Sequence, residues 1–346
     1  WHAVLFDPTG AGNNIDLGTL GGDWSGAYCI NDAGQIVGAA YEGQWDMRAT
    51  LFDPTSWPGH NINIDLGTLG GGTSGAHCIN KAGRIVGWAD NSQDWQHATL
   101  FDPTGAGNNI DLGTLAGYQH STADSINDAG QIVGKSRDSQ GRYRATLFDP
   151  TGAGNNIDLG TLAGFGYSYA SSINNAGQIV GYALGFDFVT WAAILFDPTG
   201  AGNNIDLGTL EGPGSYANSI NDVGQIVGWA ENSQSHRRAT LFDPTGGGNN
   251  IDLNTLIDPA SGWTLTTAND INNSGWIVGQ GINPQGESHA FLLIPSYSKY
   301  SGGTGEPNDP YQISSAEDLI ALGNEPNDYD KHFILTANID LDPNLP

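Results

Sequence analysis

The sequence predicts an all-β protein, a six-bladed β-propeller with four-stranded blades, followed by a short C-terminal α/β extension. The phrase LFDPTGAGNNIDLGTL occurs six times with few changes, and its first residue falls at Leu5, Leu51, Leu100, Leu147, Leu195 and Leu241. Each copy is followed by A-x-x-I-N-x-x-G-x-I-V-G, which begins at Ala27, Ala76, Ala123, Ala170, Ala217 and Ala268. A repeat of about 47 residues without helical periodicity is typical of propeller blades. A parallel β-helix is the alternative, but its rungs are usually shorter.

Each repeat contains four short runs in which apolar and polar residues alternate, as in half-buried strands. In the fifth copy the predicted strands are Ala217–Asn221, Gln225–Ala230, Ala239–Phe242 and Asn250–Leu253. Asn-Asp-x-Gly, between the first two, favours a hairpin because Asn and Gly tolerate positive φ. Asp-Pro-Thr-Gly, between the last two, favours a turn because Pro presets φ and Asp caps its own turn.

The two ends of the repeat region predict how the ring closes. Trp1 to Leu20 holds only the third and fourth strands of a blade, and the last copy supplies the first two, around Ala268–Asn272 and Trp276–Gly279. Joining them in one blade would fasten the ring. One strand is then surplus, because His289–Ile294 (HAFLLI) repeats the type of His2–Phe6 (HAVLF). The sequence leaves open which of these two pairs at the seam. The predicted propeller domain covers residues 1–295.

Residues 296–346 depart from the repeat. Ser301–Asn308 is a linker rich in Gly, Pro and Asn. A short helix is predicted with Ser314 as N-cap and Glu317 completing a capping box, and Gly323 is its C-terminal stop. A strand is predicted from His332 to Leu341. This segment resembles the start of GLUG-type right-handed β-helix modules of large bacterial surface proteins, so we expect it to pack on the propeller or to belong to a longer module.

Composition and charge exclude several classes of function. The 51 glycines and the 14% of charged residues fit a turn-rich all-β protein. The formal charge of −26 argues against nucleic acid and against an anionic membrane surface, because both attract cationic proteins. No apolar run approaches the ~20 residues of a membrane helix. The chain begins at Trp1 rather than Met and shows no signal peptide, so we interpret it as a processed or excised segment.

The two cysteines, Cys29 and Cys78, occupy the same position in consecutive repeats, where the other copies have Ser or Asp. We interpret them as small buried thiols. A disulfide needs Cα atoms within roughly 7 Å, which is tight for equivalent positions on neighbouring blades. Two cysteines give little information about the compartment.

Variation among the copies predicts where a binding site lies. The N-[DKN]-x-G and DPTGAGNN loops are nearly invariant and belong to one face of a propeller. The loops after the second and fourth strands differ freely and belong to the other face, which we call the variable face. Its second-strand loops are residues 42–48, 91–97, 138–144, 185–191, 232–238 and 283–289. Flat aromatic rings beside polar groups suit sugars, although aromatics also cap blade ends. The aromatic residues predicted there are Trp24, Trp45, Trp95, Tyr118, Tyr143, Phe165, Tyr167, Trp191 and Trp263.

A second set of candidates follows the invariant Ala of A-x-x-I-N. The first x reads Tyr28, His77, Asp124, Ser171, Asn218 and Asn269. Arranged around a channel mouth, these side chains would form a polar pocket that orients a ligand. The alternative is that they pack between blades and bind backbone groups.

The sequence gives little support for a metal or cofactor. Asp7 to Asp16 and its copies gather oxygen atoms that could suit Ca²⁺, but the spacing is not that of an EF-hand loop and six copies are most simply six turns. No histidine spacing indicates zinc, and no glycine-rich segment opens a helix to hold phosphate. We therefore expect no cofactor, with Ca²⁺ as the alternative.

The motifs I-D-L-G-T-L-G-G, S-x-A-x-x-I-N-x-x-G-Q-I-V-G and A-x-L-F resemble the HAF-type extracellular repeat family over residues 1–295. The resemblance implies a secreted or cell-surface bacterial protein, often one module of a larger chain, and it carries no catalytic residues across.

The leading hypothesis is an extracellular module that binds a polysaccharide or a surface protein, as a monomer or as part of a larger chain. Its candidate ligand-binding residues are Tyr28, His77, Asp124, Asn218, Asn269, Trp24, Trp45, Trp95, Tyr118, His120, Tyr167 and Trp191.

Two alternatives stay open. One is a polysaccharide lyase or hydrolase at the channel mouth, with Tyr28, His77 or Asp124 in catalysis and Arg144 or Arg238 neutralising a uronate. The small number of basic residues and the acidic charge of the chain disfavour this enzyme hypothesis. The other is a structural or assembly unit of a surface protein, which the near-identity of the repeats suggests.

Overall fold

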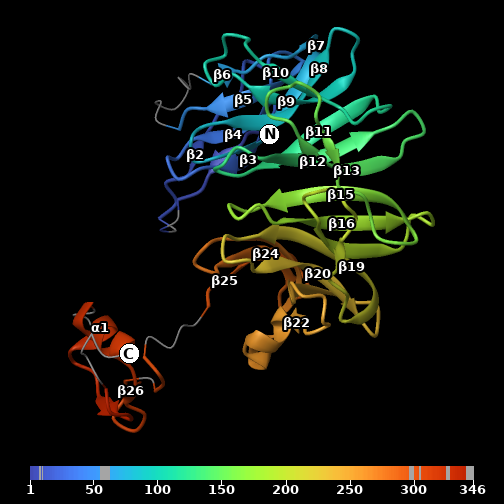
Figure 1. Cartoon of the computed structure of the whole chain (residues 1–346). Helices are drawn as coiled ribbons and strands as arrows, with labels where there is room; N and C mark the ends of the chain where they lie inside the picture. The colour runs from blue at the N-terminus through green and yellow to red at the C-terminus, as the bar shows by residue number, and fades with distance from the viewer. Residues whose placement is uncertain are drawn as a thin grey trace. The chain divides into compact units, whose positions relative to one another are not determined.

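The computed structural model describes residues 1–7, 9, 11–54, 63–295, 300–303, 305–324 and 328–339. The chain divides into two compact units, Trp1–Leu293 and Ile294–Pro346 (Figure 1). The first unit is a series of antiparallel sheets in chain order, each built from consecutive strands. No helix in the described part of the chain is both long and apolar enough to cross a bilayer.

Six of these sheets are the blades. Their strands, from the innermost outward, are β3 (Ser25–Ile30), β4 (Ile36–Tyr41), β5 (Met47–Phe52) and β6 (Ile64–Asp65) in blade 1; β7 (Gly70–Ile79), β8 (Ile85–Asn91), β9 (Gln96–Phe101) and β10 (Ile110–Gly113) in blade 2; β11 (His120–Ile126), β12 (Ile132–Arg137), β13 (Tyr143–Phe148) and β14 (Ile157–Asp158) in blade 3; β15 (Phe165–Ile173), β16 (Ile179–Gly185), β17 (Trp191–Phe196) and β18 (Ile205–Asp206) in blade 4; β19 (Glu211–Ile220), β20 (Ile226–Asn232), β21 (Arg237–Phe242) and β22 (Ile251–Asp252) in blade 5; and β23 (Thr264–Ile271), β24 (Ile277–Ile282) and β25 (Ser288–Leu293) in blade 6. The short 3-10 helices Leu253–Leu256 and Pro259–Ser261 join blades 5 and 6.

The fifth repeat shows how closely the strands follow the sequence pattern. The hairpin between β19 and β20 is the predicted Asn-Asp-x-Gly turn: the amide of Gly224, at φ 85°, donates to the carbonyl of Asn221 at 3.0 Å. β19 starts before the predicted strand, because Glu211 and Ser215 already pair with β20. The outermost strand, β22, is shorter than predicted.

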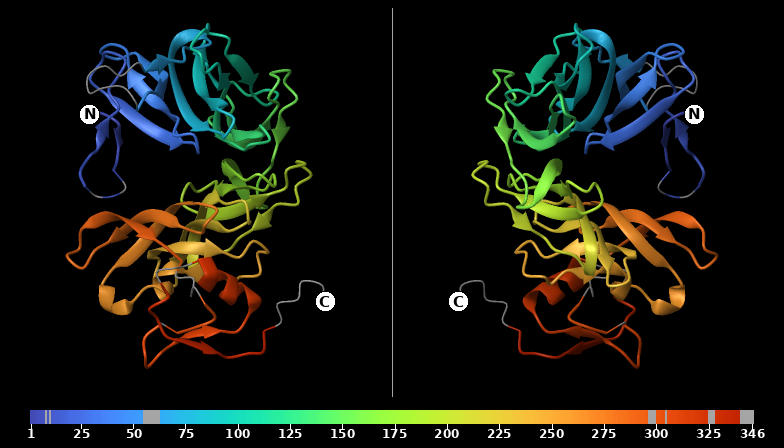
Figure 2. Two further views of the ribbon diagram at one scale, coloured as in Figure 1. Left: turned by 90° about the vertical axis from the view of Figure 1, so that its left-hand side faces the viewer. Right: turned by 90° about the vertical axis from the view of Figure 1, so that its right-hand side faces the viewer.

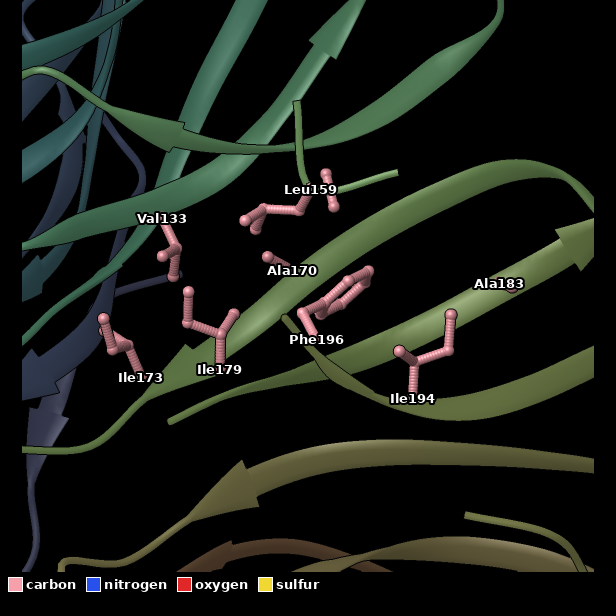
Figure 3. Close-up of a cluster of buried hydrophobic side chains, with 9 residues drawn as sticks. Val133, Leu159, Ala170, Ile173, Ile179, Ala183, Ile194 and Phe196 are labelled. Carbon is pink, nitrogen blue, oxygen red and sulfur yellow. The ribbon is translucent and has the colours of Figure 1, made fainter. Parts of the chain in front are cut away.

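Consecutive blades pack face to face through apolar side chains. Between blades 3 and 4, Val133 and Leu159 contact the buried face of blade 4, which includes Ile179 and Phe196 (Figure 3). Equivalent residues fill the other four interfaces between consecutive blades. The glycine of I-V-G is required for this arrangement, since a Cβ at Gly134 would collide with the backbone of β11.

Repeated polar residues of the blades and their loops make hydrogen bonds between neighbouring blades from blade 1 to blade 5. Asn109 of the DPTGAGNN loop donates to the carbonyls of Leu66 and Thr68 in blade 1, at 2.8 and 3.2 Å. The Ser121 hydroxyl accepts from the amide of Ala98 at 2.8 Å and donates to a carbonyl of blade 2 at 2.6 Å. Because these groups satisfy otherwise buried backbone atoms, the repeated Asn and Ser are part of the scaffold.

The six Ile-Asn segments converge on a common axis. They line a cavity of about 500 Å³ to which all six blades contribute. In blades 1 to 5 the Asn side chain bonds the next blade: Asn80 donates to the carbonyl of Asn127, and Asn127 to that of Asn174, both at 3.0 Å. Six sheets stacked around one axis confirm the predicted six-bladed β-propeller.

The sixth blade differs from the prediction for its closure. The N-terminal strands β1 (Val4–Leu5) and β2 (Ile15–Asp16) pair with each other and form a separate two-stranded sheet. The third strand of blade 6 is β25, which pairs with β24 from Ser288 to Leu293, so blade 6 has three strands in the described part of the chain. The expectation that both chain ends share one blade is therefore wrong. HAFLLI rather than HAVLF occupies the edge of β24 within the described residues, and the two sheets remain separate in both views of Figure 2.

The β1–β2 hairpin packs on blade 1 as each blade packs on the next. Ala3 and Leu17 are buried against Ile36, Ala40 and Phe52. The hairpin supplies only the outer half of a blade. The inner half of the blade 1 face stays open, and we call this gap the seam.

The second unit is small and mixed. β26 (Tyr311–Ile313) pairs in parallel with β27 (Phe333–Leu335), and α1 (Ala316–Asn324) lies between them in sequence. Tyr300 is buried against Tyr311 and Phe333. Two predictions need correction here. The N-cap is Ser315 rather than Ser314, because the Ser315 hydroxyl accepts from the amide of Asp318 at 3.2 Å. The predicted strand from His332 is short, and its end beyond residue 339 lies outside the described residues.

Candidate functional site

The six residues predicted to surround the channel mouth share one local feature. Each is the extra residue of a β-bulge in the innermost strand: in blade 2, Ala76 pairs with Gly87 and Cys78 with Val86, so His77 has no partner on β8. A bulge redirects the side chain of the unpaired residue. The same shift in register occurs at Tyr28, Asp124, Ser171, Asn218 and Asn269.

Three charged or polar side chains from blades 2 and 3 form a hydrogen-bonded chain. His77 Nδ1 lies 3.1 Å from Asp124 Oδ1, and Lys135 Nζ donates to Asp124 Oδ2 at 2.8 Å. Burial opposes the charge on Asp124, but Lys135 and His77 outweigh it and lower the pKa of the carboxyl. Burial likewise opposes the charge on Lys135, yet Asp124 raises the pKa of the ammonium. The pair is therefore fully ionised at neutral pH.

The other bulge residues divide between two roles. Tyr28 meets His77 edge to face with ring centroids 6.2 Å apart, and its side chain is half exposed. Asn218 donates to the carbonyl of Ala268 at 2.7 Å, so it ties blade 5 to blade 6 as the interblade alternative predicted. Ser171 hydrogen-bonds Tyr216, and Asn269 is exposed. The structure thus brings together Tyr28, His77 and Asp124.

A cavity of about 240 Å³ opens beside this chain of contacts, between blades 2 and 3. We call it the blade 2–3 cavity. Side chains from the ends of β7, β9, β11, β12 and β13 form its wall, next to the variable loops 91–97 and 138–144. The lining residues are His77, Gln96, His120, Ser121, Thr122, Lys135, Arg137 and Tyr143.

Arg137 gives this cavity an unusual donor. Its Nε is buried and has no hydrogen-bond partner in the described part of the chain. Two effects lower the pKa of His120: burial, which is the larger, and the nearby charge of Arg137. The lowered pKa keeps the His120 ring neutral at pH 7. The cavity therefore offers the Arg137 guanidinium, which has no ion-pair partner among the described residues, and the Lys135 ammonium, which Asp124 neutralises.

A row of aromatic rings starts at the cavity wall and crosses blades 3 to 5. We call it the aromatic row. Its centroid distances are 5.1 Å from Tyr143 to Tyr169, 4.4 Å from Tyr169 to Tyr182, 4.0 Å from Tyr182 to Tyr216 and 6.2 Å from Tyr216 to Trp229. Burial raises the pKa of Tyr169, Tyr182 and Tyr216, so these phenols stay neutral. The Arg237 guanidinium ends the row, 4.1 Å from the Trp229 ring centroid.

The other predicted aromatics lie at several places around the blades. Trp191 joins the aromatic row, 5.3 Å from Tyr182, and Trp95 lies 6.3 Å from His120 at the cavity. Trp45 is strongly exposed, with 77% of its surface accessible. The remaining ring contacts are Trp24 with Tyr41, Tyr167 with Phe186 and Phe188, and Trp263 with His289.

Several site residues were missed because they stand inside the repeated phrases. Lys135, Tyr182 and Trp229 follow I-V-G directly, and Tyr169 and Tyr216 precede the invariant Ala. A comparison of the copies at these two positions would have shown that they vary. The residues after I-V-G are Ala39, Trp88, Lys135, Tyr182, Trp229 and Gln280. Only the fold shows that their side chains meet those of the neighbouring repeat.

The arginines considered for the lyase alternative lie elsewhere. Arg144 hydrogen-bonds Tyr118, and one of its terminal nitrogens is buried without a partner among the described residues. Arg238 Nε lies 3.7 Å from Asp252 Oδ2. Burial, and to a smaller extent Tyr41, raise the pKa of Tyr28, so less of the phenolate that could act as a base is present at neutral pH.

The DPTGAGNN aspartates, considered for Ca²⁺, are hydrogen-bonded within their own turns. Asp102 Oδ1 accepts from the amide and hydroxyl of Thr104, at 3.0 and 2.7 Å. Its Oδ2 accepts from the side chain of Asn108 at 2.8 Å. In the described part of the chain, no three His, Cys, Asp or Glu side chains come close enough to share a metal ion. The hydrogen bonds explain the motif as a turn.

Comparisons with known proteins show similarity in fold. No family model and no curated protein matches the sequence. Among solved structures, the β-propeller domain of the trilobed protease from Pyrococcus furiosus, which has an open velcro topology, is 12% identical with a TM-score of 0.49, covering 78% of this chain and 83% of that one. A gluconolactonase from Xanthomonas campestris is also 12% identical, with a TM-score of 0.41, covering 85% of this chain and 95% of that one.

Proposed function

We propose that this propeller is an extracellular or cell-surface binding module that recognises a carbohydrate through its variable face. One observation carries the proposal: the aromatic row begins at the wall of the blade 2–3 cavity, so its partly exposed rings Tyr143 and Tyr169 lie next to the hydrogen-bonding groups of the cavity. Sugars combine apolar C–H faces with hydroxyl groups, and such a surface matches both. The resemblance to HAF-type extracellular repeats agrees with this location.

The test is a glycan array followed by calorimetric titration of the strongest ligands. Tyr143→Ala and Tyr169→Ala are expected to weaken binding about tenfold or more, because stacked aromatic contacts are lost. Phe188→Ala is the matched control. This residue is 62% exposed in the variable loop of blade 4 and contacts Tyr167 rather than the aromatic row. Equal losses in all three variants, or no glycan binding at all, would contradict the proposal.

Catalysis by the same site is the second candidate, because the hydrogen bond that Asp124 accepts from His77 orients the His77 ring beside the cavity. An assay for reducing ends or unsaturated products on the bound polysaccharides distinguishes the two. Turnover by the unmodified protein that disappears in His77→Ala would replace the binding-only proposal.

A further inference from the structure

We infer that the blade 2–3 cavity binds the carboxylate of an acidic, uronate-bearing oligosaccharide, whose neighbouring sugar ring lies against Tyr143 and Tyr169 at the start of the aromatic row. This inference rests on the proposed carbohydrate binding and specifies the class of ligand.

The first argument is the charge inside the cavity. In a chain with 37 acidic and 11 basic residues, this wall carries Lys135 and Arg137 together. Asp124 already accepts the Lys135 hydrogen bond at 2.8 Å. The Arg137 guanidinium is the charge that remains to be neutralised, and an anion is the ligand that would do so.

The second argument is the unpartnered donor. A buried N–H without an acceptor costs stability, and native structures normally satisfy it. The Nε of Arg137 is such a donor. A guanidinium presents its N–H groups in a planar fork that matches both oxygens of a carboxylate, which favours this group over a neutral hydroxyl.

The third argument comes from the repeats as an internal control. At the position of Arg137 the other copies have Tyr41, Asp90, Leu184, Glu231 and Ile282. Those blades fold with the same register, so the scaffold does not require a cation there. Two of the five alternatives even carry the opposite charge. The cationic pair is therefore a feature of blade 3 alone.

The fourth argument is the size and continuity of the surface. A cavity of about 240 Å³ holds one charged group with part of its sugar ring, not an oligosaccharide. Tyr143 belongs both to the cavity wall and to the aromatic row, and Tyr216 and Tyr143 are close enough to raise the Lys135 pKa. A chain anchored by its carboxylate in the cavity would thus meet Tyr143 and Tyr169 next.

The experiment compares a uronate oligosaccharide with the same oligosaccharide after reduction of its carboxyl groups. Calorimetry of the full chain is expected to show about tenfold tighter binding of the acidic form, as for one charge-assisted hydrogen-bonded pair. Arg137→Gln should remove this preference and leave the affinity for the reduced form unchanged. Arg142→Gln is the matched control: Arg142 is exposed, pairs with Asp138 at 2.7 Å and is absent from the cavity wall.

The outcomes separate the two proposals. Equal affinity of the unmodified protein for both oligosaccharides, or a preference that survives Arg137→Gln, would overturn the carboxylate site while leaving carbohydrate binding intact. Failure of both to bind would remove both proposals. Tighter binding of a sulfated neutral oligosaccharide would also overturn the choice of carboxylate. The melting temperature checks the variant, because losing an unpartnered Nε should not destabilise the fold, and a clear decrease would indicate a structural role.

Discussion

At the scale of single residues, the repeats show how one position acquires different chemistry. The third residue of A-x-x-I-N is Ser in blades 3 to 5 but Cys29 and Cys78 in blades 1 and 2. The two sulfurs lie 3.6 Å apart as free thiols, so equivalent positions on neighbouring blades come into contact at the axis. The hydrogen bond from Cys78 lowers the pKa of Cys29 to about 7, and the same bond together with burial raises the pKa of Cys78.

We predict that Cys29 is the more reactive thiol at neutral pH. Because the thiolate reacts, its alkylation by iodoacetamide should rise with pH through a midpoint of about 7. A cavity of about 320 Å³ at the seam, lined by Cys29, gives the reagent access. Mass spectrometry of the labelled peptides gives the rates. Cys78→Ser keeps a hydrogen-bond donor beside Cys29 and Cys78→Ala removes it, so the midpoint should rise more in Cys78→Ala. Faster labelling of Cys78 than of Cys29 would contradict this assignment.

The candidate site depends on residue contacts that the sequence reveals only in part. His77 and Asp124 could be predicted because they vary at a fixed position next to the invariant Ala. Lys135 and Arg137 could not, since nothing in a strand pattern shows which side chain of the next blade they meet. The distance of 47 residues between His77 and Asp124 is one repeat, and one repeat is the separation of neighbours in a propeller.

At the scale of elements, the DPTGAGNN loop is a turn whose aspartate holds it together. Hydrogen bonds lower the pKa of Asp102 to about 2. The bond from the Thr104 hydroxyl contributes most, followed by those from the Thr104 amide and the Asn108 side chain. Asp149, Asp197 and Asp243 accept the same hydrogen bonds and also have a pKa of about 2. In each of them the bond from the Thr hydroxyl is the largest cause. The Asn that follows ties the loop to the previous blade, so the motif serves both turn and interface.

We predict that Thr104→Ala raises the pKa of Asp102 toward 3.8 and leaves the three equivalent aspartates unchanged. A carboxyl with a lowered pKa stabilises the fold fully above about pH 4, and this contribution disappears as the pH falls through about 2. The variant should therefore lose less stability than the unmodified protein between these two values. Carboxyl ¹³C titration by NMR gives the four midpoints in one sample. An unchanged Asp102 midpoint would show that the Thr hydroxyl is not the main cause.

At the scale of the whole molecule, the ring is continuous around the axis but open at the seam. The Val of I-V-G is fully buried in blades 1 to 5, whereas Val278 of blade 6 is 45% exposed. On the other side of the seam, Ile30 is 54% exposed, although its equivalents in the later blades are buried. Both residues are exposed for the same reason: β25 holds the edge of β24, and β1–β2 supplies only half a blade.

We predict that Val133→Ala destabilises the propeller much more than Val278→Ala does. Removing two methyl groups from the fully buried Val133 leaves a cavity between blades 3 and 4, and the expected loss in the free energy of unfolding is about 2–3 kcal/mol. Val278 is 45% exposed and no blade of the described residues packs over it, so its loss should stay below about 1 kcal/mol. Urea unfolding of both variants measures the difference. Equal losses would mean that the seam is closed in solution by packing on blade 6.

The sequence alone determined the scaffold, because its chemistry is local and repeated six times. Strand alternation, Asn-Asp-x-Gly hairpins and Asp-Pro-Thr-Gly turns act over a few residues, so their positions, the blade number and the separation of invariant from variable loops could be predicted. The tertiary structure decided which side chains meet across blades. It joined His77, Asp124 and Lys135, left the Arg137 Nε without a partner among the described residues and placed β25 rather than β1 at the edge of β24. These outcomes depend on packing between segments one or more repeats apart, where similar sequences compete for the same place and local patterns do not distinguish them.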